Sequence, residues 1–246
     1  HIERTRDGEN NRDDLRKNLL WREKVISVIC VWNNEEQYQN ILIHSLNIQD
    51  CDYELISIDN RNHAFTSCAT ALNWGADHST GDFTHQDISF EKKSSLKEFG
   101  QFIKAHPDII IGAFGAKQKA YREDYLCDTV DECCFGMTRE VFDSLRFNEK
   151  ACNGWHLYAV EMCLRAKERA KFGGGVCNPG IWHFSGGNVD LSYMKKFKQL
   201  LVMYKHQGYI CTTCKKCRAI WCIIMLIFLF GELRNCLWEI FPLCKL

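Results

Sequence analysis

The chain has 246 residues, of which 46% are hydrophobic and 25% are charged. That balance is typical of a globular protein with a buried core and excludes a disordered or fibrous chain. The 31 Lys and Arg residues offset the 31 Asp and Glu residues, so no overall positive field exists to attract nucleic acid. We therefore expect no nucleic-acid partner, and any anionic ligand must be held by local groups.

The fifteen cysteines do not indicate a disulfide framework. Their number is odd and the chain is large, and it starts without a signal peptide, so a reducing, cytoplasmic location is expected. Cys30, Cys133 and Cys134 lie in apolar runs and are expected to be buried thiols. Within a strand, the adjacent Cys133 and Cys134 would point to opposite faces.

Three regions differ in composition. Residues 1–24 are mostly polar and charged, which predicts an N-terminal arm or linker. Residues 25–210 carry the patterned segments of one domain. Residues 211–246 form a cysteine-rich apolar tail, in which a run of twelve apolar residues, 219–230, is too short to span a bilayer comfortably. The tail therefore favours peripheral membrane contact or a partner-facing helix.

The first half of the domain alternates strand and helix patterns. From Val25 the run VISVICV is typical of a strand buried on both faces, a helical stretch reaches Leu46, and Tyr53–Ile58 predicts a second strand. A helix follows over Ser67–Trp74. Another helix carries Leu96, Phe99 and Ile103 on one face behind a Ser94 or Ser95 cap, and Ile109–Ile111 begins the next strand. Such alternation predicts a parallel-type sheet covered by helices.

The second half has a different pattern. Asp131–Met137 predicts a strand, and Trp155–Ala170 predicts a helix with one apolar stripe, which core packing explains. Leu191–Tyr204 has helical spacing behind Asp190, a candidate N-cap.

Polar clusters follow the predicted strands at Asn33–Glu35, Asp59–Arg61 and His85–Asp87. Ligands of open α/β sheets bind at the carboxyl ends of the strands. A carboxylate after the second strand suits the base or ribose of a nucleoside, whereas a later Asp and His suit a divalent ion shared with a diphosphate. The two clusters are therefore complementary.

The order of several strings resembles the family 2 glycosyltransferases, and more narrowly the StrF-like group. The resemblance covers about residues 25–206 and rests on these strings: ISVICVWNNEE, ELISIDNR, SCATALNWGA, GD with HQD, DTVDECCFGMTREVFDSLRFNEK, NGWHLYAVEMCLRA and IWHFSGG. It implies a GT-A fold, a Rossmann-like mixed sheet that is mostly parallel and flanked by helices. It also implies transfer of a sugar from a nucleotide-diphosphate sugar, most simply a UDP-sugar, to a hydroxyl of a glycan or other acceptor.

The resemblance also implies a metal and a donor site. Asp59 is similar to the acidic residue that holds the nucleotide base, with Asn33, Glu35, Asn60 and Arg61 beside it. The triplet His85–Gln86–Asp87 stands at the metal motif of the family, with Asp87 as the remaining acidic ligand. A neutral imidazole at His85 suits Mn²⁺ better than Mg²⁺. His183 is similar to a downstream histidine that completes the metal shell.

The general base stays open at this point. Relatives place an acidic pair before the acceptor-side helix, where this chain has Gly154–Leu157, so His156 is the candidate base. Glu161 and the pair Asp131–Glu132 are alternatives, each also explicable as a solvated or capping carboxylate. Direct displacement with inversion is expected, because no nucleophile and acid pair is evident.

One departure from the family pattern concerns the segment before the metal triplet. Only Asp82, Phe83 and Thr84 separate Gly81 from His85, whereas the family has a longer apolar strand there. A shortened strand would draw the triplet back from the sheet edge. The alternative function is therefore a degenerate GT-A domain that binds nucleotide without catalysis.

Overall fold

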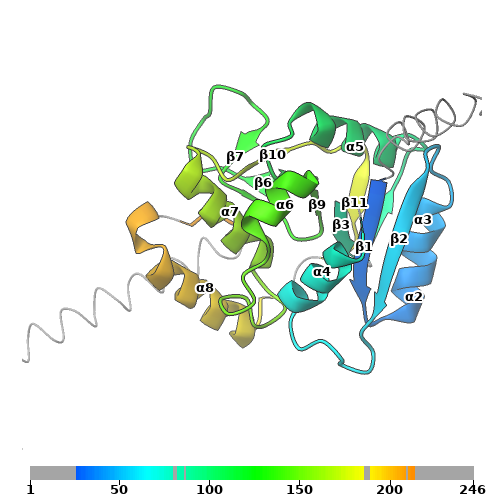
Figure 1. Ribbon diagram of the computed structural model, residues 1–246, viewed down its shortest axis with the longest axis horizontal. Coiled ribbons are helices and arrows are strands. Elements are labelled where there is room, and N and C mark those ends of the chain that lie inside the picture. Colours follow the sequence, from blue (N-terminus) through cyan, green and yellow to red (C-terminus); the bar gives the residue numbers. More distant parts are fainter. Residues whose placement is uncertain (1–25, 80–81, 86, 186–188, 209, 214–246) are drawn as a thin grey trace, which may run out of the picture.

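The computed structural model describes residues 26–79, 82–85, 87–185, 189–208 and 210–213, with the backbone alone for 82–85. Its main element is a seven-stranded sheet in the order β2-β1-β3-β9-β5-β10-β7. Helices cover both faces of this sheet, and α8 lies at the end remote from β2 (Figure 1). The α/β class expected from the sequence is confirmed.

One half of the sheet is parallel. Strand β1 (Ile26–Trp32) lies between β2 (Tyr53–Asp59) and β3 (Asp82–His85) and runs parallel to both. Asp59 is in register with Trp32, and His85 is in register with Val31. The carboxyl ends of β2 and β3 therefore reach the same edge within one residue of each other. The sequence had suggested that the short β3 ends well before that edge. The register shows that β3 reaches it.

The other half of the sheet is mixed. Strand β9 runs antiparallel to both β3 and β5, β10 runs parallel to β5, and β7 runs antiparallel to β10. Three of the six pairings are thus antiparallel, and the expected mostly parallel sheet is wrong on this point. The strands of this half are β5 (Ile111–Gly112), β7 (Leu126–Cys127), β9 (Cys134–Gly136) and β10 (Gly174–Val176).

Two small antiparallel sheets accompany the main one. Strand β4 (Ile88–Phe90) pairs with β11 (Ile181–His183), and β6 (Gly115–Ala116) pairs with β8 (Thr129–Val130). The first of these ladders joins the segment after β3 to a segment from the far end of the domain.

One face of the main sheet is covered by α4 (Cys68–Asp77), α6 (Arg139–Leu145) and α7 (Tyr158–Arg169). Their apolar side chains form one core cluster with Ile29, Ile58 and Phe135 of the sheet. Ser67 begins α4 by accepting the backbone N–H of Thr70. The predicted apolar stripe of α7 packs into this cluster.

The opposite face is covered by two helical segments. The first runs through α2 (Glu35–Gln37), the π-helix η1 (Tyr38–Ile43) and α3 (His44–Leu46), and the second is α5 (Ser95–Ala105). Leu42, Leu96 and Phe99 join Val28 and Cys30 of β1 in a second core cluster. Successive residues of β1 therefore supply two different cores.

A third apolar cluster joins α8 (Leu191–Met203) to the outer side of α7. Asp190 caps α8, as predicted, by accepting the backbone N–H of Tyr193 at 2.9 Å. A 3-10 turn, η2 (Lys205–Gln207), follows. The chain then returns to the domain, where the hydroxyl of Thr129 donates to the carbonyl of Cys211 at 2.9 Å, so the packed region extends past the expected boundary at residue 210.

Several expectations concern residues outside the described ranges, among them the arm 1–24 and, from residue 214, the cysteine-rich tail with the run 219–230. In the part of the chain that the structure describes, no helix has the length and apolar character needed to cross a bilayer. Each described cysteine is a free thiol. Cys133 is buried but precedes β9, and it packs in the same core cluster as Cys134.

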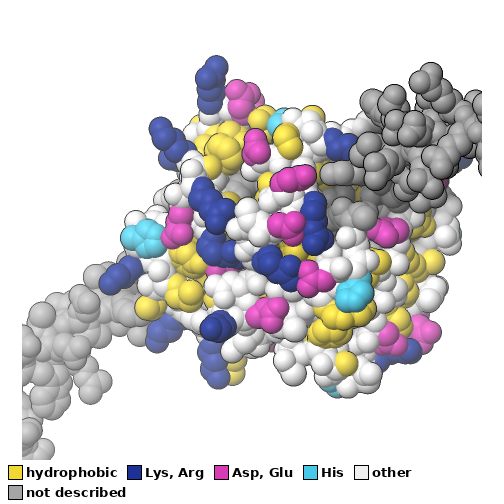
Figure 2. Space-filling view, in the orientation of Figure 1, with side chains coloured by type: hydrophobic (Ala, Val, Ile, Leu, Met, Phe, Trp, Pro, Cys, Tyr) yellow, Lys and Arg dark blue, Asp and Glu magenta, His cyan; other side chains and the backbone are white. Residues whose placement is uncertain are grey.

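Acidic and basic side chains intermingle on the face of the molecule drawn in Figure 2. This surface agrees with the balanced charge of the sequence. No single-sign field extends over that face, so an anionic ligand has to be bound by groups at one place.

We predict that Gly75→Ala destabilises the protein by about 1–3 kcal/mol. An added Cβ at Gly75 would lie 2.5 Å from Cγ2 of Ile29, although alanine in a helix interior is ordinarily the more stable residue. Denaturant unfolding measures the change. Gly154→Ala is the matched control, because nothing lies within 4 Å of its added Cβ; equal stability of the two variants would contradict this packing.

Candidate active site

The ladder between β4 and β11 brings Asp87 and His183 together. His183 is in register with Ile88, the residue after Asp87, and the backbone N–H of Phe184 donates to the carbonyl of Asp87 at 3.1 Å. Nε2 of His183 consequently lies 3.3 Å from Oδ2 of Asp87. Two residues that the sequence assigned to one metal site are thus neighbours, held by main-chain hydrogen bonds.

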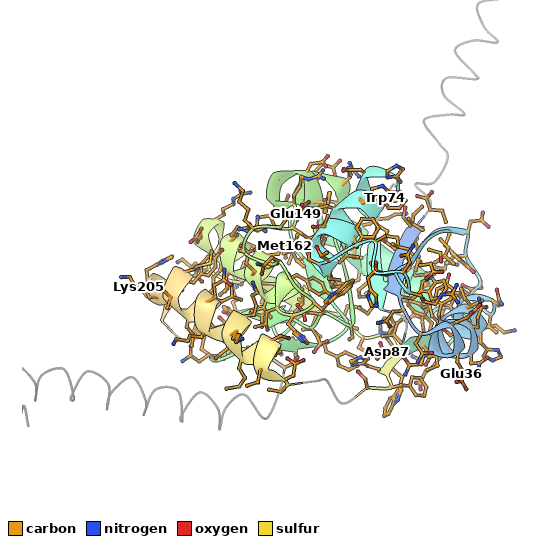
Figure 3. All side chains as sticks on the ribbon, turned by 90° about the horizontal axis from the view of Figure 1, so that it is seen from below. Glu36, Trp74, Asp87, Glu149, Met162 and Lys205 are labelled. Atoms are coloured by element: carbon orange, nitrogen blue, oxygen red, sulfur yellow. The ribbon has the colours of Figure 1, made fainter. Side chains whose placement is uncertain are left out.

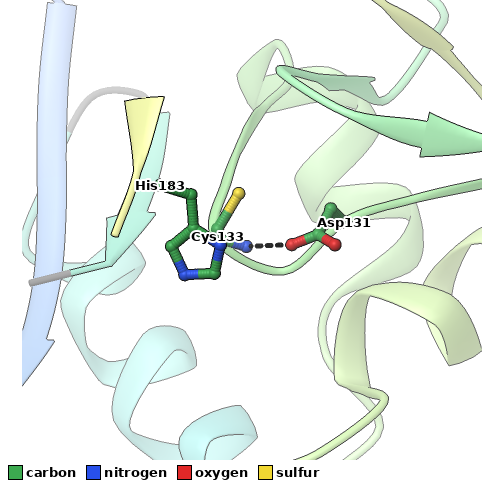
Figure 4. Close-up of side chains that lie close together, drawn as sticks. All are labelled: Asp131, Cys133 and His183. Atoms are coloured by element: carbon green, nitrogen blue, oxygen red, sulfur yellow. Dashed lines mark hydrogen bonds between the residues drawn. The ribbon is translucent and has the colours of Figure 1, made fainter. Parts of the chain in front are cut away.

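The turn between β8 and β9 adds two further side chains. A carboxylate oxygen of Asp131, the Sγ of Cys133 and a ring nitrogen of His183 all lie within 4.8 Å of one another, and Figure 4 shows the three side chains converging. The backbone N–H of Cys133 donates to Oδ1 of Asp131 at 2.9 Å. We call Asp87, Asp131, Cys133 and His183 the four-residue cluster.

The four-residue cluster has a negative electrostatic character. Burial raises the pKa of the Cys133 thiol, and the charges of Asp131 and Asp87 raise it further. Burial lowers the pKa of His183, but its hydrogen bond to Asp87 and the charges of Asp87 and Asp131 raise it by more, so the net shift is upward. Both groups hold their protons more firmly than usual, Cys133 chiefly because it is buried and His183 because carboxylates lie beside it. A cation suits this position.

The sequence singled out Asp87 and His183 for this cluster but missed Cys133, which it treated as a buried thiol, and named Asp131 only as an alternative base. The Asp-x-Cys spacing directly before a buried strand was the one available signal. The side chain of His85, the third predicted ligand, lies outside the described part of the structure.

The cluster lies on the side of the molecule that holds β1 and β2. In Figure 3, Asp87 lies far from Lys205, and β4, which follows Asp87, contacts η1 and α3. The thiol of Cys30 on β1 has a pKa raised first by burial and then by the charge of Asp87. Asp87 is therefore within electrostatic reach of the strand that pairs with β2.

A second group of predicted residues meets at the end of β2. Arg61 donates from Nε to Oδ1 of Asp59 at 3.0 Å and from Nη2 to Oδ2 at 2.6 Å, and its Nη1 donates to Oε2 of Glu35 at 2.5 Å. The guanidinium lies 4.8 Å above the ring of Trp32. Hydrogen bonds from Arg61 lower the pKa of Asp59, so this carboxylate is ionised. Side chains of this group are about half exposed.

Asn60 and Asn33 occupy different environments. Asn60 is buried, and its side chain accepts the N–H of Phe65 at 2.8 Å and donates to the Phe65 carbonyl at 3.1 Å. The Asn60 amide therefore holds the loop after β2 in shape. Its side chain is used for this purpose and not for the nucleotide-sugar contact predicted from the sequence. Asn33 is exposed, next to Asn34, which caps α2.

His156 lies before α7 and contacts the beginning of α8. Its Nε2 is 3.5 Å from Oδ1 of Asp190, and its ring meets that of Tyr193 edge-on at 5.5 Å. The side chain is 21% exposed. An imidazole held by a carboxylate on one nitrogen has the arrangement of an oriented base.

Glu132 connects the start of α7 to the turn that carries Asp131 and Cys133. Its Oε1 accepts the backbone N–H of Ala159 at 3.3 Å. Burial raises its pKa to about 8, although hydrogen bonds from the backbone of Leu157, Ala159 and Tyr158 act in the opposite direction. Leu157 has φ of 63°, in the left-handed region that a leucine rarely adopts. The loop carrying His156 is thus fastened to the four-residue cluster.

Glu161 is fully buried inside the helical layer. It pairs with Nη2 of Arg165 at 2.9 Å, and it accepts hydrogen bonds from Tyr204 at 2.7 Å and Asn148 at 3.1 Å. The reason for this burial is that α7 packs on both sides, against the sheet and against α8. Its carboxylate therefore ties three segments together.

No protein-family model matches this sequence, and no curated protein matches it. Solved structures that resemble the chain include the mannosyltransferase PcManGT from Pyrobaculum calidifontis in complex with GDP-Man and Mn2+, at 14% identity and a TM-score of 0.49. That match covers 65% of this chain and only 55% of the other.

Two other solved structures resemble the chain. TarS 1–349 from S. aureus has 12% identity and a TM-score of 0.43, over 80% of this chain and 77% of that one. A197 from STIV has 9% identity and a TM-score of 0.41, over 65% of this chain and 86% of that one. Such low values transfer neither a site residue nor a substrate, and the function has to be argued from the residues themselves.

We predict that Glu161→Gln lowers the free energy of unfolding by about 3 kcal/mol, because it leaves Arg165 without its charged partner in a largely buried place. Urea unfolding measures this loss. Asp143→Asn is the control, since its pair with Arg139 is exposed and is worth about 1 kcal/mol or less. Unchanged stability together with lost turnover would instead indicate a catalytic carboxylate.

Proposed function

We propose that this chain transfers a sugar from a nucleotide-diphosphate sugar, most simply a UDP-sugar, to a hydroxyl of a glycan or other acceptor, with the help of a divalent cation. The observation that carries the proposal is the pairing of Asp87 with His183 beside Asp131, near the strand edge at which Asp59 ends β2. A single ligand with a nucleoside at one end and a diphosphate at the other would contact both the group around Asp59 and the cation held by Asp87 and His183.

The donor end is formed by Asp59, Glu35 and Arg61, with Asn33 beside them. The carboxylates of Asp59, which ends β2, and Glu35, which begins α2, accept hydrogen bonds from ribose hydroxyls or a base, and Arg61 keeps Asp59 ionised and oriented. Strands lie about 4.8 Å apart, so the ends of β2 and β3, separated by β1, are about 10 Å apart. A nucleoside diphosphate bridges such a span.

The chain's residues fit a divalent cation at the four-residue cluster. Carboxylate oxygens of Asp87 and Asp131 and a nitrogen of His183 are a donor set for Mn²⁺, and the imidazole favours it over Mg²⁺. A cation bound there neutralises negative charge on the leaving diphosphate. Asp87 and His183 would hold it, and the β4–β11 ladder keeps both in place.

His156 is the proposed general base. Asp190 orients its ring from one side, so a neutral nitrogen can take the proton of the acceptor hydroxyl; such a base contributes about 10²–10⁴-fold to the rate. Glu132 is the alternative, because its pKa of about 8 suits proton transfer near neutral pH. With one base and no assigned nucleophile, a direct displacement with inversion follows.

We place this activity in the cytoplasm, since each described cysteine is a free thiol and reduced cysteines are typical of that compartment. Leu191, Val202 and Met203 of α8 are exposed. These side chains lie shortly before the apolar tail in the sequence, and we propose peripheral contact with a membrane through that tail.

The central test is hydrolysis or transfer of a panel of nucleotide sugars with and without Mn²⁺. We expect turnover that needs the metal and falls by at least about 10²-fold in Asp87→Ala, while Asp143→Asn, which alters an exposed carboxylate, stays near wild type. Turnover that is independent of metal and unchanged in Asp87→Ala would refute the assignment. Calorimetric binding of a nucleoside diphosphate without turnover on any acceptor would favour the non-catalytic binding function.

A second test concerns the donor end. Arg61→Gln removes the cation that orients Asp59, and we expect nucleoside diphosphate to bind about tenfold more weakly, a loss of about 1.4 kcal/mol. Isothermal calorimetry measures the dissociation constant. Arg139→Gln, which alters an arginine paired with Asp143 on α6, is the control and should leave binding unchanged.

A further inference from the structure

The thiol of Cys133 is a group that the proposed transfer does not use. Cys133 differs from an ordinary core thiol because its sulfur lies within 4.8 Å of a carboxylate oxygen and of an imidazole nitrogen (Figure 4). Its neighbour Cys134 is buried to the same extent, 1% exposed, and belongs to β9. Burial alone therefore does not distinguish the two, whereas the side chains around Cys133 do.

The geometry offers three protein ligands to one ion: a carboxylate oxygen of Asp131, the Sγ of Cys133 and a ring nitrogen of His183. Zinc-type bonds of about 2.0–2.3 Å place tetrahedral ligand atoms roughly 3.6 Å apart. The described spacing of up to 4.8 Å exceeds this by about an ångström, which side-chain rotations can close. Asp87 is outside this group of three; its Oδ2 lies 3.3 Å from Nε2 of His183, where it orients the imidazole and adds negative charge beside the centre.

The chain holds these ligands from several directions. Asp87 and His183 are fixed by the β4–β11 ladder. Asp131 accepts hydrogen bonds from the backbone N–H of Cys133 and from the hydroxyl of Thr213. Hydrogen bonds to a ligating carboxylate orient it and are a regular part of metal sites in proteins.

We infer that the Cys133 thiolate joins Asp131 and His183, with Asp87 beside the imidazole, as a ligand of this cation, so that the centre binds a thiophilic divalent ion, Zn²⁺ or Co²⁺, more tightly than Mn²⁺ or Mg²⁺. The inference rests on the cation site of the proposed function and makes its ion specific. Binding converts the Cys133 thiol to a thiolate and releases its proton to solvent. Thiolate and imidazole ligands bind Zn²⁺ and Co²⁺ better than Mn²⁺, and Mg²⁺ is the poorest match.

The test is a titration of the full-length chain with CoCl2, in the presence of a reductant that is not a thiol. Cobalt bound by a thiolate gives a ligand-to-metal charge-transfer absorption in the near ultraviolet. Cys214, Cys217 and Cys222 are replaced by serine in every sample, because short-spaced tail thiols also bind cobalt. We expect about one equivalent of cobalt to produce the band, and ZnCl2 to displace it at lower concentration than MnCl2 or MgCl2.

Cys133→Ser should abolish the band and weaken cobalt binding at least about tenfold, whereas the matched variant Cys134→Ser should retain both. Thermal unfolding of the two variants shows whether each is folded. Should Cys133→Ser fail to fold, Asp131→Asn serves instead: it keeps the thiol and is expected to weaken cobalt binding by a similar factor. A band that survives in Cys133→Ser, or affinity unchanged in Asp131→Asn, would overturn the inference.

The outcomes separate this inference from the proposed function. A cobalt band lost in Cys133→Ser supports the thiolate centre even if no nucleotide sugar is turned over. Conversely, metal-dependent turnover that requires Asp87, in a protein without any cobalt–thiolate band, retains the transferase and refutes the thiolate ligand.

Discussion

The structure depends on a strand that is buried on both faces. Ile29 and Cys30 of β1 are fully buried and enter different core clusters, so each residue step along β1 alternates between the α4 side and the α5 side. The one small polar side chain of this strand, Ser27, is buried and has a partner, since its hydroxyl donates to a carboxylate oxygen of Glu54 on β2. Because β1 pairs with both β2 and β3, its burial also sets where those two strands end, and hence where the donor group and the Asp87 segment lie.

The sequence predicted the elements whose patterns are long and uniform. The runs of β1 and β2, the helix α4 and the Asp190 cap of α8 each have a local signal strong enough to be seen without tertiary context. The mixed half of the sheet was predicted only in part: strands were expected close to β5 and β9, whereas the two-residue β7 shows no periodicity. Strand direction was also hidden, since β9 looks the same in sequence whether it runs parallel or antiparallel.

The site residues likewise fall into those that sequence motifs predicted and those that only the tertiary structure shows. Asp87 with His183, and Asp59 with Arg61, were assigned from motifs, and the structure brings each of these pairs together. Glu161 had looked available because charged residues on a helix are mostly solvated; the packing of α8 on the outer side of α7 places it inside. Cys133 was interpreted as a core residue because a core cysteine and a buried metal-ligating cysteine have the same apolar neighbours in the sequence. Only tertiary structure separates those two cases.

The donor group and the four-residue cluster differ in their exposure to water, and this makes them respond differently to ionic strength. Arg61 meets Asp59 and Glu35 with side chains 42–60% exposed, whereas Asp87 and His183 are 12% and 20% exposed. Dissolved salt screens charges in water over about 8 Å at physiological concentration and acts much less on buried pairs. Rising salt therefore loosens the arginine at the nucleotide end first, while the histidine and aspartate pair stays closed.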